Sequence, residues 1–82
     1  MLDRSLVHFT PMEQAILEIL ADGEPHPLYE FNEVIDDPIN TRKTLRDHIY
    51  RIRKKLQPYR EDVFCRVTGY QHFYIHVKHL HS

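Results

Sequence analysis

Residues 41–56 constrain this chain more than any other segment. Leu45, Ile49, Ile52 and Leu56 recur at intervals of four, three and four residues, which is the spacing of one apolar stripe on an α-helix. At about 100° per residue, the opposite face of that helix carries polar and mostly basic side chains: Lys43, Arg46, Asp47, Tyr50, Arg51 and Lys54. The pattern predicts a helix that is buried on one side and positively charged on the other.

The charge of the chain is divided unevenly along its length. The net charge is −1, but residues 1–40 hold nine acids and one base, whereas residues 41–82 hold three acids and ten bases. Such an asymmetry predicts one electropositive surface on an otherwise acidic body. A surface of that kind can meet the phosphates of a nucleic acid whatever the average charge is.

A first helix is expected to begin at Thr10-Pro11-Met12-Glu13. The Thr10 side chain can accept from the Glu13 amide while the Glu13 carboxylate reaches back to Thr10, and proline suits the first helical position. Gly23 can adopt the left-handed conformation that ends a helix.

A second helix is predicted over residues 27–35. Pro27 opens it, and Asp36-Asp37-Pro38 ends it because a residue before proline avoids helical angles. Asn40 or Thr41 is the expected N-cap of the third helix. The apolar face of the second helix would hold Leu28, Phe31, Val34 and Ile35.

Short strands are expected elsewhere in the chain. Residues 6–9 can form one, and the β-branched and aromatic runs 63–67 and 73–77 read as a hairpin with its tip at residues 68–72. The fold class predicted for residues 1–82 is therefore mainly α with a small β part: one domain with three helices and a C-terminal β-hairpin, which is the winged helix-turn-helix order.

Three segments resemble the OmpR/PhoB-type effector domains of bacterial response regulators. Thr44-Leu45 together with the run His48-Ile49-Tyr50-Arg51-Ile52-Arg53-Lys54-Lys55-Leu56 is similar to the recognition helix of that family. Phe9-Thr10-Pro11-Met12-Glu13 resembles the opening of its first helix, and Val67-Thr68-Gly69-Tyr70 falls where the family has its wing. The resemblance covers residues 7–76.

The resemblance implies a sequence-specific regulator of transcription that binds double-stranded DNA. The helix at residues 41–56 would enter the major groove, which is about 12 Å wide, and the hairpin at residues 63–77 would contact the backbone or the minor groove. Base contacts are expected from Arg51, Arg46 and Asp47. Phosphate contacts are expected from Lys43, Thr44, His48, Tyr50, Arg53 and Lys54, and wing contacts from Arg66, Thr68, Gly69, Tyr70, Gln71 and His72. The family's receiver domain and polymerase-contacting loop have no counterpart, so repression is expected rather than activation.

Two copies on DNA are expected, as a homodimer or as a head-to-tail pair, because one short helix reads few base pairs. The alternative reading is a bacterial or phage winged-helix module that binds a protein and not DNA. A protein-binding face is normally depleted of lysine and rich in aromatic residues, whereas Tyr50 is the one aromatic residue on the exposed face of the basic helix.

Other function classes find little support. There is no glycine-rich phosphate loop, and Cys65 and Ser5 have no recognisable catalytic partners, so a non-enzyme without cofactor or small-molecule ligand is expected. His72, His76, His79 and His81 lack the cysteine pair or acidic ligand typical of zinc sites, so no metal site is expected. The apolar stretches are too short to span a bilayer and the first residues do not resemble a secretory signal. A cytoplasmic location is expected.

Overall fold

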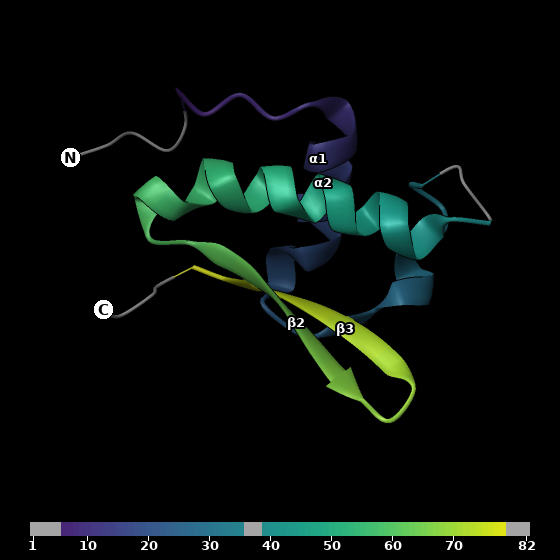
Figure 1. The fold of residues 1–82 in the computed structure, drawn as a ribbon. Helices are drawn as coiled ribbons and strands as arrows, with labels where there is room; N and C mark the ends of the chain where they lie inside the picture. Colours follow the sequence, from purple (N-terminus) through teal and green to yellow (C-terminus); the bar gives the residue numbers. More distant parts are fainter. Residues whose placement is uncertain (1–5, 36–38, 79–82) are drawn as a thin grey trace.

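The computed structural model describes residues 6–35 and 39–78, and it has two α-helices and a three-stranded antiparallel sheet (Figure 1). The sheet order is β1-β3-β2. The elements are α1 (Pro11–Ile19), η2 (Leu20–Asp22), β1 (His26–Pro27), η3 (Leu28–Phe31), α2 (Thr41–Leu56), η4 (Gln57–Tyr59), β2 (Asp62–Thr68) and β3 (Gln71–Val77), where η denotes a short 3₁₀ helix.

Helix α1 begins where the sequence predicts, but it ends at Ile19, and the 3₁₀ helix η2 continues the chain to the expected stop at Gly23. The Glu13 amide donates to the Thr10 hydroxyl oxygen at 3.2 Å, and the Thr10 amide donates to the Glu13 carboxylate at 2.9 Å. This reciprocal pair satisfies two amides that have no partner within the helix. After η2 the chain turns at Gly23, whose φ of 75° is left-handed.

Helix α2 has the predicted bounds, and its apolar stripe forms one wall of the core. Asn40 is the N-cap, although its side chain makes no capping hydrogen bond. In Figure 1, α2 lies across one side of the β2–β3 hairpin and α1 passes behind α2. The stripe residues Leu45, Ile49, Ile52 and Leu56 are all buried.

The predicted three-helix fold with a separate hairpin wing is wrong. Instead of a helix over residues 27–35, the structure has strand β1 followed by the single turn of η3. Pro27 is extended, with φ −70° and ψ 157°, and it pairs with Phe73 of β3 while His26 pairs with Tyr74. Leu28 and Phe31 are three residues apart, so their side chains lie on one side of the 3₁₀ turn η3. Phe31 and Ile35 are buried, and Leu28 and Val34 pack against the core while partly exposed, so the apolar residues expected on a helix still contribute to the core.

The hairpin is longer than expected and belongs to the sheet. Thr68 pairs with Gln71, so the tip is only Gly69 and Tyr70. Gly69 has φ 61°, which suits the first position of a two-residue hairpin loop. The short strand predicted at residues 6–9 is also wrong, because residues 7–10 form no regular secondary structure. The predicted helix end at residues 36–38 lies outside the described residues.

The two faces of the β2–β3 hairpin have different surroundings. Val63, Cys65, His72, Tyr74 and His76 alternate onto the face directed at the helices, where Val63, Tyr74 and His76 are buried. The Tyr74 ring packs edge-on against Phe31, with ring centroids 5.9 Å apart. Phe64, Phe73 and Ile75 alternate onto the other face and stay partly exposed. The sheet therefore contributes one face to the core and aims Cys65 and His72 at α2.

Candidate nucleic-acid interface

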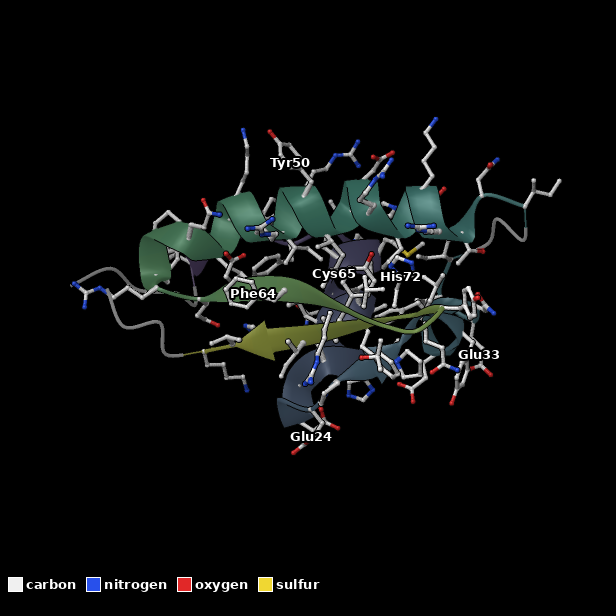
Figure 2. The ribbon with its side chains drawn as sticks, turned by 60° about the horizontal axis from the view of Figure 1, so that its bottom comes forward. Glu24, Glu33, Tyr50, Phe64, Cys65 and His72 are labelled. Carbon is white, nitrogen blue, oxygen red and sulfur yellow. The ribbon has the colours of Figure 1, made fainter. Side chains whose placement is uncertain are left out.

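The side of α2 farthest from the core is exposed to solvent. We call it the outer face of α2; its residues are Lys43, Asp47, Tyr50, Arg51 and Lys54, all of them exposed. The Lys54 ammonium lies 4.9 Å from the centre of the Tyr50 ring, a cation–π contact. Figure 2 shows Tyr50 projecting away from the sheet. The outer face thus contains two of the predicted base-contact residues, Arg51 and Asp47, and three predicted phosphate contacts.

The side of α2 that faces the hairpin carries three arginines. Arg42, Arg46 and Arg53 line a groove of about 350 Å³ between α2 and the inner face of β2 and β3. The predicted base contact Arg46 therefore lies at the edge of the outer face and not in its middle. The groove is also lined by Ile49, Tyr50, Val63, Cys65, Val67, His72 and Tyr74.

Arg53, predicted as a phosphate contact, already has an anionic partner in the protein. Its Nε donates to one carboxylate oxygen of Asp62 at 2.7 Å and its Nη2 donates to the other at 3.2 Å. Burial acts to raise the pKa of the Asp62 carboxyl, but the hydrogen bonds from Arg53 and from the Val63 amide lower it on balance. The sequence analysis missed this pair because it assigned Arg53 to a phosphate contact and considered no partner for it within the protein.

The side of α2 that faces α1 is half-buried. Thr44 and His48, two further predicted phosphate contacts, lie here with intermediate exposure. The Lys55 ammonium donates to the Glu13 carboxylate at 2.5 Å, and Glu13 is 1% exposed. Burial acts to raise the pKa of Glu13, but Lys55 and Thr10 lower it on balance. The capping pattern identified Glu13, yet no local signal could have shown a partner 42 residues away.

The predicted wing residues are distributed along the hairpin. Arg66, Thr68 and Gln71 are exposed strand residues, and Gly69 and Tyr70 form the tip. His72 is half-buried and turned toward the groove, where its Nδ1 lies 3.9 Å from the Cys65 sulfur (Figure 2). His72 therefore belongs to the groove, and the exposed tip consists of Gly69 and the fully exposed Tyr70.

Acidic side chains gather on the part of the molecule that lies away from α2. Glu24 and Glu33 project there in Figure 2, and Asp22 and Glu30 flank His26 on either side. The hydrogen bond with Asp22 at 2.8 Å is the largest cause of a raised His26 pKa; burial opposes it and Glu30 adds to it. The charge asymmetry of the sequence is thus a charge asymmetry of the surface.

No group of three metal-ligating side chains is found within residues 6–35 and 39–78. His76 contacts Glu61 at 2.8 Å and His72 contacts Cys65, whereas His79 and His81 lie outside the described residues. Over the same part of the chain, no helix is long and apolar enough to cross a membrane.

Comparison with known proteins identified no relative of this chain. No family model matches the sequence, and no curated protein or solved structure is significantly similar to it.

Proposed function

We propose that this chain binds double-stranded DNA and places the outer face of α2 in the major groove. One observation carries the proposal: Lys43, Arg51 and Lys54 project from one face of α2, and none of them pairs with a carboxylate among the described residues. Positively charged side chains that share one face and lack a carboxylate partner repel each other. Binding to a polyanion such as DNA relieves that repulsion. Phosphate contacts of this kind release counterions and supply much of the affinity for DNA.

The dimensions of α2 support the same proposal. Sixteen residues at 1.5 Å per residue give a helix about 24 Å long. Together with its side chains it has about the diameter that the major groove admits. Glu24 and Glu33 project on the other side of the molecule (Figure 2), and Asp47 is the one acid among the five residues of the outer face.

The exposed side chains suggest a division of roles. Arg51 lies toward the middle of the outer face, and a guanidinium there can donate two hydrogen bonds to guanine. Lys43 and Lys54 lie nearer the two ends of that face, where the DNA backbone would pass. Arg53 remains a predicted phosphate contact, but its guanidinium would have to be shared with Asp62.

The β2–β3 hairpin can add contacts to DNA beside the major groove. Arg66 and the tip residue Tyr70 are exposed, and a basic or aromatic side chain at that place can meet the backbone or the minor groove.

Selection of bound duplexes from a random pool tests the proposal. The natural chain should enrich a defined motif, and a Lys43→Gln/Arg51→Gln/Lys54→Gln variant should enrich none. A matched control, Glu24→Gln/Glu33→Gln, changes exposed acids away from α2 and should enrich the same motif as the natural chain. If the natural chain enriches no motif and shows no salt-dependent affinity for duplex DNA, the proposal is wrong and the protein-interaction reading takes its place.

A further inference from the structure

The groove between α2 and the hairpin is closed at one end and lined with chemically different walls. At the closed end the Arg53–Asp62 pair joins the last turns of α2 to the first residue of β2. From there α2 and the hairpin separate toward the hairpin tip (Figure 1). The space between them, about 350 Å³, is within the range of small-molecule sites, which is about 300–1,000 Å³.

One wall of this groove offers positive charge. Arg42 and Arg46 are one helical turn apart on α2, so they project on the same side. Both are exposed, and neither makes an ion pair with any described carboxylate. Asp62, the acid at the groove's closed end, is already bound by Arg53. The groove therefore has unpaired cations and no free anion.

The floor and the opposite wall are largely apolar. Ile49 and Val63 form the floor, and Val67 on β2 remains 58% exposed. An exposed valine on the inner face of a strand loses water contact if an apolar group fills the groove, and that burial is favourable.

Tyr74 supplies a buried polar group beside the arginines. It is 5% exposed and lines the groove. Burial and the neighbouring Cys65 thiol raise the pKa of its hydroxyl, whereas the charges of Arg42 and Arg46 act to lower it. Tyr74 and the two arginines therefore line the same groove.

We propose that this groove binds a small molecule with a carboxylate at one end and an apolar body. Arg42 and Arg46 would donate to the carboxylate, because a guanidinium matches its geometry. The apolar body would lie along Ile49, Val63 and Val67. The site uses the side of α2 next to the hairpin, so it is separate from Lys43, Arg51 and Lys54 and does not depend on DNA binding.

Three probes separate the two chemical requirements: octanoate has both a charge and an apolar body, acetate has only the charge, and octan-1-ol has only the apolar body. Each is titrated into the full chain while backbone amide chemical shifts are recorded. Octanoate should shift the amides of Arg46, Cys65 and His72 saturably and bind at least about tenfold more tightly than either other probe. No saturable binding of octanoate, or equal binding of octan-1-ol, would overturn the proposal.

Variants then locate the binding site. Arg42→Gln and Arg46→Gln should each weaken octanoate binding by about tenfold. Arg51→Gln is the matched control, because it removes the same charge from the same helix on its outer face, and it should leave octanoate affinity unchanged. Val67→Thr keeps the size of the exposed side chain and should weaken octanoate binding without strengthening acetate binding. If Arg51→Gln weakens octanoate binding as much as Arg46→Gln does, the probe responds to net charge and the groove is not its site.

Discussion

The guanidinium of Arg53 donates to both carboxylate oxygens of Asp62, at 2.7 Å and 3.2 Å, and so ties the end of α2 to the start of β2. Asp62 is buried, whereas the Arg53 side chain is 41% exposed. The Asp62 carboxylate also accepts from the Val63 amide at 2.8 Å. The pair joins α2 to β2 at the end of the groove that Arg53 lines.

Loss of this pair should destabilise the fold. Asp62→Asn is expected to lower the free energy of unfolding by about 1–3 kcal/mol, because a charge-assisted hydrogen bond at a buried carboxylate is lost. In a double-mutant cycle with Arg53→Gln, the coupling should be smaller, about 1 kcal/mol, since solvent screens the exposed arginine. Chemical denaturation measures both values. Arg51→Gln is the control and should change stability by no more than about 0.5 kcal/mol; an equal effect of Asp62→Asn and Arg51→Gln would show that the pair contributes nothing.

The Glu13 carboxylate should matter more than an ordinary helix cap, because it caps α1 and also pairs with Lys55 of α2. Thr10→Ala should cost about 0.5–2 kcal/mol of unfolding free energy through loss of the cap alone. Glu13→Ala should cost more than Thr10→Ala, whereas Glu13→Gln, which keeps an acceptor for the Thr10 amide, should cost less than Glu13→Ala. Thermal and denaturant unfolding of the three variants would test this order, and equal losses for Glu13→Ala and Thr10→Ala would contradict the role of Lys55.

His26 should make stability depend on pH near neutrality. Its pKa is raised in the folded state above the ordinary 6.5, chiefly by Asp22. The stability that protonated His26 contributes is therefore fully present below pH 6.5 and is lost as the pH rises through the folded pKa. His26→Gln should remove this part of the pH dependence, and Asp22→Asn should remove most of it. The check is the difference in unfolding free energy between each variant and the natural chain across that range; a difference that is constant with pH would exclude the linkage.

Signals within a few residues of one another predicted the start of α1, helix α2 and the hairpin, but not the overall fold. The four-residue capping pattern at Thr10 and the stripe from Leu45 to Leu56 gave the start of α1 and the bounds of α2, because each depends on local spacing. The segment after Gly23 was mispredicted as a helix because its strand β1 exists only through pairing with β3, between residues as distant as Pro27 and Phe73. No sequence signal near Pro27 indicates that this segment pairs with a strand so far along the chain.

For the candidate interface, the sequence predicted which basic residues are exposed but not which of them form ion pairs. The helix that carries the basic run has the predicted bounds, and Lys43, Arg51 and Lys54 are exposed as expected. Arg53 and Lys55 belong to the same run, but they pair with Asp62 and Glu13. A charge pattern indicates which residues can face solvent. It does not indicate which of them form ion pairs within the protein, because the acidic partners come from other parts of the chain.

Arg51 and Lys43 should differ in how they contribute to DNA binding. Arg51→Ala should lose about 1–3 kcal/mol of discrimination at one base pair of the selected motif, because a base contact is removed. Lys43→Ala should weaken binding to matched and mismatched duplexes alike, since a phosphate contact is removed. It should also reduce by about one the slope of the logarithm of the binding constant against the logarithm of the salt concentration. Titrations of both variants across a salt series make the comparison. If Arg51→Ala loses equal affinity on every sequence, Arg51 contacts only phosphate.

Mapping the surface that duplex DNA covers tests the central claim most directly. Backbone amide chemical shifts of the natural chain are recorded as a selected duplex is added. The amides that shift most should lie on α2 between residues 43 and 54, with a second set at the hairpin tip near Tyr70. Amides near Glu24, Glu33 and the rest of the acidic side should change little. Shifts concentrated on that acidic side, or absent from α2 at saturating DNA, would contradict the assignment of α2 as the DNA-binding helix.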